Sequence, residues 1–353
     1  MRVLEIMGSL HRGGAENMIM NYYRAFDKEL CQMDFVVHAE FENDFREEAK
    51  KLGAKIIVLP QPGKVGAFKY INLLVKAIKE NGPYDAIHSH VDAQSFLSVI
   101  AAKLCKIKKI IVHSHTTRYS KIKLFINRMV FASFRVVRLA CGEKAGKAFY
   151  GKKKFTVISN AIDASAFKEH IKNQANAPSR SSKTKIIGHL GRFFAPKNHE
   201  FIVSLAKELK EKQVDACIHL YGKGALEEHI KSLVKDANVE DYVHFMGLTK
   251  NPIEAYLSFD LFILPSLFEG FPVTLVEAQL ANLPCLVSDS ISKECDLELG
   301  LLTYLPLDAD TWAKEITKCF EENRTETSAT NSDIIANYDV SIQWKRLLSI
   351  YKS

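Results

Sequence analysis

Short apolar runs alternate with amphipathic segments along nearly the whole chain, and this pattern restricts the fold more than any other feature. A short apolar run followed by a turn and a helical period is typical of a buried parallel strand and its crossover helix. Repetition of that unit predicts α/β architecture with doubly wound parallel sheets. The runs that we expect to be strands are 2–7, 33–38, 55–59, 86–90, 109–116, 137–141, 155–158, 185–190, 216–221, 243–246, 262–264, 284–287 and 303–305.

The chain is long enough for two domains, because 353 residues exceed one ordinary hydrophobic core. The segment 168–185 is polar, contains Pro178 and offers few apolar anchors, so it predicts a linker. The segments that we expect to be helices are 15–26, 45–52, 68–79, 94–104, 200–212, 226–236, 273–282, 311–322 and 342–351.

The composition is that of a globular protein, with 47% hydrophobic and 25% charged residues. Seven scattered cysteines without C-x-x-C spacing indicate a reducing compartment and argue against disulfides and structural zinc. Glu5 interrupts the first apolar run, which is too short and too polar for a signal peptide, and no run approaches a membrane span. We therefore expect a cytosolic protein.

The region 103–154 is strongly basic, with fifteen lysines and arginines against one acid, Glu143. Within it, 121–138 interleaves apolar residues with cations. One interpretation is a core helix with a solvated basic face, and the other is a surface that lies on anionic lipid. We expect no nucleic-acid partner, because no nucleic-acid-binding module accompanies the charge.

The segment 262–289 combines a strand, the turn FEGFP, a helix and a second strand. Glu269 lies in the predicted loop and Glu277 in the predicted helix, about two helical turns apart, so they can share one face. Loops at the carboxyl ends of parallel strands bind ligands in such sheets. The amides of Thr274 and Leu275 at the helix start would suit a phosphate. An isolated pair of glutamates is more often solvated, so the flanking turn and strands carry the functional interpretation.

Two further loops have the character of anion sites. Arg192 and Lys197 follow the strand 185–190 and precede a helix, where a planar guanidinium and a point charge can clamp a diphosphate. Gly13 and Gly14 follow the first strand and permit close approach of backbone to an anion. The spacing is not G-x-G-x-x-G, which argues against NAD.

Four histidines, His88, His90, His113 and His115, alternate along two predicted strands. Alternate residues share a face, so a metal site is one interpretation. We expect no metal there, because the sequence offers no carboxylate or cysteine partner nearby. We expect all four instead at the carboxyl ends of neighbouring strands, facing the ligand cleft.

Together these segments resemble the retaining family 4 glycosyltransferases, which have the GT-B fold. The resemblance is most specific in two places, the Glu269–Glu277 spacing within PSLFEGFPVTLVEAQLANLPCLVSD and the segment GRFFAPKNHEF. GSLHRGGAE and SNAID are also similar, with Ala161 where the family has glycine. The resemblance covers essentially the whole chain and implies two Rossmann-like domains that face each other across a cleft. It implies an acceptor domain at 1–165, a linker at 166–185, a donor domain at 186–337, and a terminal helix at 338–353 that packs back on the first domain.

The resemblance also implies roles for individual residues. Arg192 and Lys197 would stabilise the leaving diphosphate, Glu269 would hold the sugar, and His115 would contact it, with His113 as an alternative two residues earlier. The leaving phosphate would deprotonate the acceptor, so neither a metal nor another cofactor would be required. The other implied donor-binding residues are Gly13, Gly14, Asn160, Gly222, Leu248, Gly270, Phe271, Thr274, Leu275 and, for the ribose, Glu277.

The function implied is retaining, metal-independent transfer of a hexose or N-acetylhexosamine from a nucleotide diphosphate sugar, with UDP as the expected nucleotide. The acceptor would be a glycan or a lipid-linked precursor of exopolysaccharide or capsule, with peripheral contact at the inner face of the membrane through 103–154. The alternatives are a non-catalytic nucleotide-sugar binder and a sugar-nucleotide 2-epimerase. A glycosidase with paired carboxylates is rejected, because it leaves Arg192 and Lys197 unexplained.

Overall fold

The chain divides into two compact units in the computed structural model, which describes residues 1–11, 13–42, 44–167, 169, 184–249, 251–269, 271–321 and 332–353. Unit 1 comprises Met1–Asp163 together with Ala336–Ser353, and unit 2 comprises Ala164–Ile335. Most of the predicted linker, 166–185, lies outside the described residues, as does Gly270.

Unit 1 contains a parallel sheet with the strand order β3-β2-β1-β4-β5-β6-β7 among the residues described. The order runs outward in both directions from β1, as in a doubly wound sheet. Its strands are nearly continuous apolar runs, because both faces are covered. The strands are β1 (Arg2–Ile6), β2 (Gln32–Val37), β3 (Ile56–Val58), β4 (Ala86–Ser89), β5 (Lys109–Ser114), β6 (Val137–Ala140) and β7 (Thr156–Val157).

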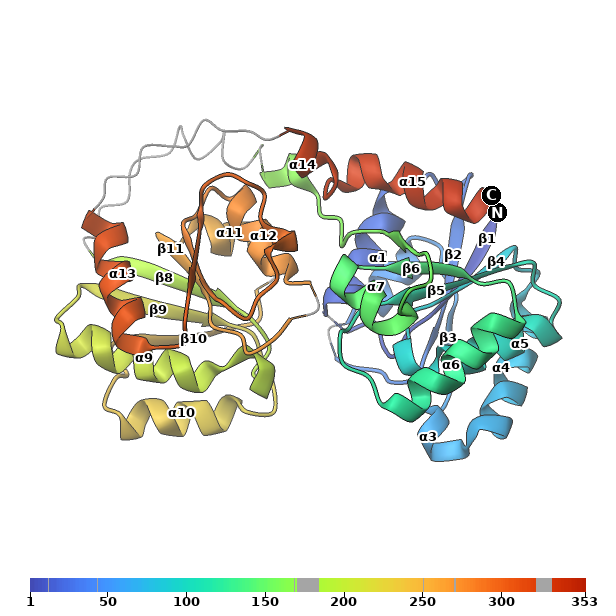
Figure 1. Ribbon diagram of the computed structural model, residues 1–353, viewed down its shortest axis with the longest axis horizontal. Helices are drawn as coiled ribbons and strands as arrows, with labels where there is room; N and C mark the ends of the chain where they lie inside the picture. The colour runs from blue at the N-terminus through green and yellow to red at the C-terminus, as the bar shows by residue number, and fades with distance from the viewer. Residues whose placement is uncertain are drawn as a thin grey trace. The chain divides into compact units, whose positions relative to one another are not determined.

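Helices cover both faces of the unit 1 sheet (Figure 1). The core on one face includes Val3 of β1, Tyr22 of α1 and Leu347 of α15, so the carboxyl-terminal helix packs on unit 1 as expected. The core on the other face includes Leu4 and residues of α4 to α7. The helices of this unit are α1 (Gly14–Ala25), α2 (Arg46–Lys51), α3 (Pro62–Val65), α4 (Ala67–Asn81), η1 (Asp92–Gln94), α5 (Ser95–Leu104), α6 (Lys121–Ser133), α7 (Glu143–Tyr150) and α15 (Val340–Lys352).

Unit 2 contains a second parallel sheet, in the order β10-β9-β8-β11-β12-β13 within the described chain. The order reverses between β8 and β11, and the carboxyl ends of these two strands are therefore where such a sheet binds a ligand. The strands are β8 (Lys185–Leu190), β9 (Ala216–Tyr221), β10 (Val243–Gly247), β11 (Leu261–Leu264), β12 (Cys285–Ser288) and β13 (Leu302–Leu305).

One face of the unit 2 sheet packs on α9, α10 and α13 around buried Trp312, and the other is contacted by α11, whose Tyr256 ring lies 5.7 Å from that of Phe262. The helices are η2 (Ala195–Lys197), α9 (His199–Glu211), α10 (Glu227–Asp236), α11 (Pro252–Leu257), α12 (Val273–Leu280), η3 (Lys293–Cys295), α13 (Ala309–Glu321) and α14 (Ser332–Ala336), the last of which ends in unit 1.

The predicted α/β architecture with two parallel sheets is confirmed. The amphipathic segment 121–138 is not one helix, because α6 ends at Ser133, Phe134 is extended, and β6 begins at Val137. The short helices α7 and α11 were not predicted, since few turns give little periodicity. Within the described parts of the chain, no helix has both the length and the apolar character needed to cross a bilayer.

Candidate functional site

Close approach of the loops after β8 and β9 shapes one wall of the candidate site in unit 2. Gly222 has a φ of +145°, and a Cβ at this position would lie 2.0 Å from the carbonyl oxygen of Gly191. Only glycine fits such a contact. The Gly191 amide also donates to the carbonyl of Tyr221 at 2.9 Å, so both loops are fixed beside Arg192.

Lys197 and Glu269 form an ion pair that joins the loops after β8 and β11. The distance from Lys197 Nζ to Glu269 Oε1 is 2.7 Å, and the Ser266 hydroxyl donates to the same oxygen at 2.7 Å. The two charged side chains are only 19% and 15% exposed. The structure thus brings together two residues that the sequence places 72 positions apart. Ser266 was not predicted, although it lies within the motif, three residues before Glu269.

Backbone contacts support this ion pair. Asn198 adopts a left-handed conformation with φ of 56°, and its Nδ2 donates to the carbonyl of Pro265 at 3.1 Å. The amide of Leu267 donates to the carbonyl of Pro196 at 2.8 Å. Because the residues on either side of Lys197 are bonded to the segment just before Glu269, the pair is held by its surroundings and does not depend on its own attraction alone.

Arg192 lies at the surface of the same loop. Its guanidinium carbon is 5.0 Å from the centre of the Phe194 ring, which is a cation–π distance. The side chain is exposed, whereas Lys197 is partly buried. Arg192 is therefore more exposed to solvent than Lys197 and more accessible to a ligand.

Glu277 lies in α12 and accepts a hydrogen bond from the Tyr256 hydroxyl at 2.7 Å. Burial raises the pKa of Glu277 to about 7, against the opposing effect of the Tyr256 hydrogen bond. A carboxyl group with such a pKa in a ligand-binding region is a functional candidate. Tyr256 was missed because it lies on the unpredicted helix α11.

The start of α12 agrees with the prediction. The helix begins at Val273, and Glu269 lies in the loop before it, while Glu277 lies within the helix. The Leu275 amide already donates to the carbonyl of Pro272 at 3.0 Å. The buried Thr274 hydroxyl has no partner among the described residues. Of the other predicted residues, Phe271 is partly buried and Leu248 is 52% exposed in the loop after β10.

The predicted glycine loop lies in unit 1, where α1 begins at Gly14 and Gly13 precedes it in an extended conformation. A Cβ at Gly14 would be 3.9 Å from Nδ2 of Asn160, so the structure brings these two predicted residues together. Asn160 is buried, and its Oδ1 has no partner in the part of the chain that is described. A polar atom buried without a partner is costly, which suits a residue that meets a ligand.

The four histidines form one cluster in unit 1, but they do not all lie at the strand ends. His88 and His113 are fully buried within β4 and β5, so the expectation that they face a ligand cleft is wrong. Sequence alternation shows which residues share a face, and here that face is covered by Tyr351 of α15, whose ring centre lies 5.7 Å from that of His88.

Contrary to expectation, a carboxylate belongs to this cluster. Glu5 of β1 has Oε2 2.9 Å from Nε2 of His90 and 3.3 Å from Nδ1 of His88. One ligand atom from each of His88, His90 and His113 lies within 4.8 Å of the others, which is a metal-compatible arrangement. The reason given against a metal is therefore wrong, and the expectation that none is needed stays a prediction.

His115 and Asp92 line a polar cavity of about 490 Å³ within unit 1. Asp92 accepts hydrogen bonds from the His115 amide and the Tyr119 hydroxyl, both at 2.9 Å. Burial raises the pKa of Asp92 to about 6. Burial also lowers the pKa of His115 well below its usual value, with the neighbouring His90 acting in the same direction. Because His113 is fully buried, His115 is the better candidate for contact with a ligand.

Comparisons with known proteins agree on one family. The profile described as Glycosyltransferase Family 4 matches residues 12–166, and the profile described as Glycosyl transferases group 1 matches residues 170–333. The chain is 33% identical to the putative glycosyltransferase EpsF of Bacillus subtilis over 99% of this chain and 96% of that protein. It is 23% identical to the capsular polysaccharide biosynthesis glycosyltransferase CapH of Staphylococcus aureus over 100% and 99% of the two chains.

Two further similarities concern named substrates and a solved structure. The UDP-Gal:alpha-D-GlcNAc-diphosphoundecaprenol alpha-1,3-galactosyltransferase of Escherichia coli is 28% identical over 63% of this chain and 62% of that protein. The crystal structure of Anabaena HepE in complex with UDP and glucose superposes with a TM-score of 0.79 at 18% identity, over 100% of both chains. At this identity the structural likeness shows the fold.

Proposed function

Because this chain belongs to the group 1 and family 4 glycosyltransferases and has their GT-B fold, we propose that it transfers a hexose or N-acetylhexosamine from a UDP-sugar in the biosynthesis of an extracellular polysaccharide. The Lys197–Glu269 ion pair carries this proposal, because it joins the two most specific motifs at the carboxyl ends of β8 and β11. Transfer proceeds with retention of configuration and without a metal ion.

The charges of the site suit a leaving diphosphate. Arg192 and Lys197 neutralise the negative charge that grows on the diphosphate as the sugar bond breaks, and such electrostatic stabilisation is usually the largest catalytic contribution. Glu269 accepts hydrogen bonds from the sugar hydroxyls. Lys197 holds that carboxylate in place before the donor arrives. Glu277 accepts hydrogen bonds from the ribose, and the leaving phosphate takes the proton of the acceptor hydroxyl.

The names of relatives suggest the donor and the acceptor. UDP occurs in the name of the Escherichia coli relative and in the HepE complex, and a diphosphoundecaprenol-linked sugar is named for the former. We assign this chain a UDP-hexose or UDP-N-acetylhexosamine donor and a lipid-linked acceptor on that basis. His115, Gly13, Gly14 and Asn160 of unit 1 would then contact the sugar or the diphosphate, as the family resemblance implies.

Nucleotide binding tests the donor site. UDP and a panel of UDP-sugars, added with a chelator present, should raise the melting temperature of the protein, because a ligand at 100 times its dissociation constant stabilises the folded state by about 2.7 kcal/mol. Arg192→Ala should abolish the shift. Lys212→Ala, which changes an ion-paired lysine elsewhere in unit 2, should retain it. The absence of a shift with every nucleotide in the wild-type protein would refute the proposal.

Product analysis separates the alternatives. A transferase consumes donor when a lipid-diphosphate sugar acceptor is supplied, and the anomeric configuration of the product shows retention or inversion. A non-catalytic binder would shift in melting temperature with UDP but never consume the donor. A 2-epimerase would convert the donor with no acceptor present.

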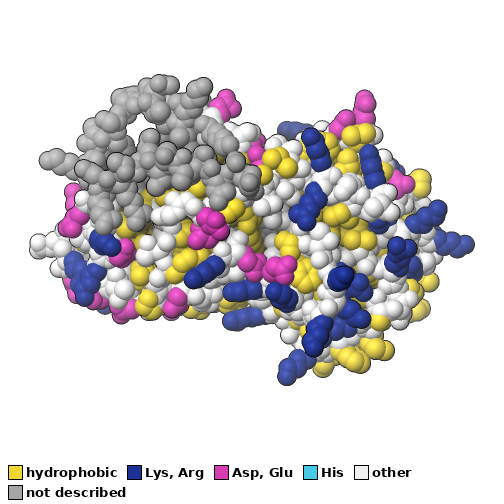
Figure 2. All heavy atoms as spheres, turned by 45° about the horizontal axis from the view of Figure 1, so that its top comes forward, with side chains coloured by type: hydrophobic (Ala, Val, Ile, Leu, Met, Phe, Trp, Pro, Cys, Tyr) yellow, Lys and Arg dark blue, Asp and Glu magenta, His cyan; other side chains and the backbone are white. Residues whose placement is uncertain are grey.

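A basic and apolar face of unit 1 supports the proposed contact with membrane. Ile122, Phe125 and Met129 of α6 are 73%, 64% and 58% exposed, and their spacing places them along one side of the helix. Lysine and arginine side chains lie among hydrophobic ones on the face of unit 1 shown in Figure 2. Exposed apolar residues beside cations are typical of a surface that lies on anionic lipid.

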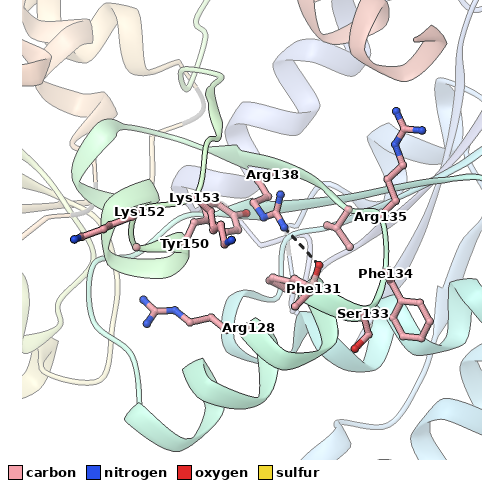
Figure 3. Close-up of a pocket in the computed structure, with 12 residues that line it drawn as sticks. Arg128, Phe131, Ser133, Phe134, Arg135, Arg138, Tyr150, Lys152 and Lys153 are labelled. Atoms are coloured by element: carbon pink, nitrogen blue, oxygen red, sulfur yellow. Dashed lines mark hydrogen bonds between the residues drawn. The ribbon is translucent and has the colours of Figure 1, made fainter.

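Beside this helix is a cavity of about 700 Å³ lined by Arg128, Arg135, Arg138, Lys152 and Lys153 (Figure 3). None of the ion pairs found among the described residues involves these five cations. Arg138 makes a long contact, 3.5 Å, with the carbonyl of Phe131. The cavity is therefore suited to a phosphate group of the lipid surface.

Liposome sedimentation tests this surface. The double variant Phe125→Ser, Met129→Ser should bind vesicles containing phosphatidylglycerol at least about tenfold more weakly, since each buried apolar side chain contributes roughly 1.5–3 kcal/mol. Phe68→Ser, which removes an 80% exposed side chain of α4, should bind as the wild type does. Equal binding to neutral and anionic vesicles, or no loss in the double variant, would contradict the proposed surface.

A further inference from the structure

A chain of buried hydrogen bonds runs from the last helix of the protein to the polar cavity of unit 1. The hydroxyl of Tyr351 donates to Glu5 Oε1 at 3.0 Å, and Glu5 Oε2 lies 2.9 Å from Nε2 of His90. The other ring nitrogen of His90, Nδ1, lies 2.8 Å from Nε2 of His115. Residues from β1, from the ends of β4 and β5, and from α15 are thereby connected through Tyr351, Glu5, His90 and His115.

The hydrogen-bond partners of Glu5 determine where the protons lie. Its Oε1 accepts from the Tyr351 hydroxyl, and its Oε2 accepts from Nε2 of His90. In a neutral imidazole one ring nitrogen donates and the other accepts, so Nδ1 of His90 accepts from Nε2 of His115. The Nδ1 of His115 is then unprotonated.

We propose that Glu5, His90 and Tyr351 are positioning residues that fix the tautomer and the ring orientation of His115. The proposal rests on the proposed function, in which His115 contacts the transferred sugar. A ring held by a directed hydrogen bond at Nε2, and by Asp92 at its backbone amide, loses little freedom when the substrate binds. The carboxyl-terminal helix thus contributes to the site through a residue two positions from the end of the chain.

A metal ion held by His88, His90 and His113 is the competing explanation for this cluster. It has some support, because Nε2 of His88 and both ring nitrogens of His113 are buried without a partner in the described chain. The hydrogen-bond chain is favoured because both ring nitrogens of His90 are already bonded, one to Glu5 and one to His115. A metal would have to displace one of these bonds.

The tautomer can be measured in the unmodified protein. Long-range ¹H–¹⁵N correlation spectra of protein labelled with ¹⁵N-histidine report which ring nitrogen carries the proton, and His115→Asn assigns the signal. We expect neutral His90 and His115, each protonated at Nε2. Protonation of His115 at Nδ1, a charged ring, or stoichiometric zinc bound to the purified protein would overturn the proposal. This measurement does not depend on which substrate the enzyme uses.

Matched tyrosine variants test the functional role. Tyr351→Phe keeps the ring packed against Phe26 but removes the bond to Glu5, and we expect kcat to fall about tenfold, with the affinity for UDP unchanged. Tyr84→Phe removes an equivalent buried bond, from Tyr84 to Asp34 at 2.9 Å, elsewhere in unit 1. It should lose similar stability and keep its kcat within about twofold. Glu5→Gln, which keeps an accepting oxygen but not the charge, should lose less activity than Glu5→Leu.

The outcomes separate the two proposals. If Tyr351→Phe and Tyr84→Phe have the same kcat, or if Glu5→Leu is as active as the wild type, the positioning role is refuted although the transferase function stands. If the wild-type protein binds no UDP and transfers no sugar, the proposed function fails. The tautomer of His115 then decides the hydrogen-bond chain alone.

Discussion

Lys197→Met should lower kcat/KM for the UDP-sugar by about 100- to 1,000-fold. Loss of one preorganised group that stabilises the developing charge has an effect of this size in other enzymes. The replacement keeps most of the side-chain volume, so the loss would report the charge. Steady-state kinetics with a lipid-linked acceptor measure it. Lys212→Met is the matched control, because Lys212 also forms ion pairs in unit 2, with Glu208 and Asp310, but lies outside the site.

Removal of Lys197 alone should lower the stability of the protein, whereas removal of Glu269 as well should restore most of it. Lys197→Met leaves the Glu269 carboxylate, only 15% exposed, without its cation, which should cost roughly 1–3 kcal/mol in the free energy of unfolding. Adding Glu269→Gln removes the unpaired charge and should restore most of that stability without restoring activity. Urea denaturation of the single and double variants measures the coupling. An active Lys197→Met enzyme, or a double variant no more stable than Lys197→Met, would contradict this assignment.

The sheets could be predicted from the sequence because every strand of a covered parallel sheet must be apolar. β8, with Lys185–Leu190, has the predicted bounds, and β9 also matches residue for residue. The short helix α11 could not be predicted, because its six residues begin at Pro252 and contain less than two helical turns. For this reason Tyr256, the partner of Glu277, was missed.

The motif residues could be named from the family resemblance, but their contacts could not. Nothing in the local sequence shows that Lys197 meets Glu269, because that contact depends on how β8 and β11 lie side by side in the sheet. The contacts of Glu5 could not be predicted either, because in the sequence it is a single polar residue within a buried strand. Its partners His90 and Tyr351 are 85 and 346 residues away. Contacts of this range follow from the topology of the sheet.

For the histidine cluster, the sequence pattern correctly predicts which residues share a face but not where that face lies in the fold. Alternation along β4 and β5 does put His88 and His113 on one face, where their rings stack with an interplanar angle of 14°. The pattern alone cannot say which face is buried or by what. The covering element is α15, which returns from the far end of the chain. A strand that carries buried polar residues is therefore better interpreted together with the helix that covers it.

Glu277→Gln should stabilise the protein at pH 8 while weakening donor binding. The pKa of Glu277 in the folded protein is about 7, above its ordinary value of 4.5. A raised pKa contributes stability at pH values below the ordinary pKa, and this contribution is lost as the pH rises through 7. The glutamine variant lacks that loss, so we expect it to be more stable than the wild type by roughly 2 kcal/mol at pH 8. This is less than the full shift of the Glu277 pKa implies, because the side chain is partly exposed. At pH 5 the two proteins should unfold alike.

Donor affinity should change over the same pH range as stability. It should rise with pH, whereas the stability contribution of Glu277 falls. Ribose hydroxyls donate to the ionised carboxylate, so a protonated Glu277 must lose its proton before binding, and affinity should rise by up to about tenfold between pH 6 and pH 8. A UDP-sugar is the appropriate ligand, because both phosphates are esterified and do not titrate in this range. Calorimetry should show a flat pH profile and about tenfold or greater weakening at pH 8 for Glu277→Gln.

Glu254→Gln is the control for that titration, since Glu254 lies on the neighbouring helix α11 and bonds to Asn251. It should keep the pH dependence of the wild type. A pH-independent affinity in the wild-type protein would mean that Glu277 does not receive the ribose. A site that accepts a less stable fold at pH 8 in order to keep a partly buried carboxylate has a functional reason for that residue. Stability gained and affinity lost in one substitution would therefore identify Glu277 as a ligand-binding group more directly than loss of activity alone.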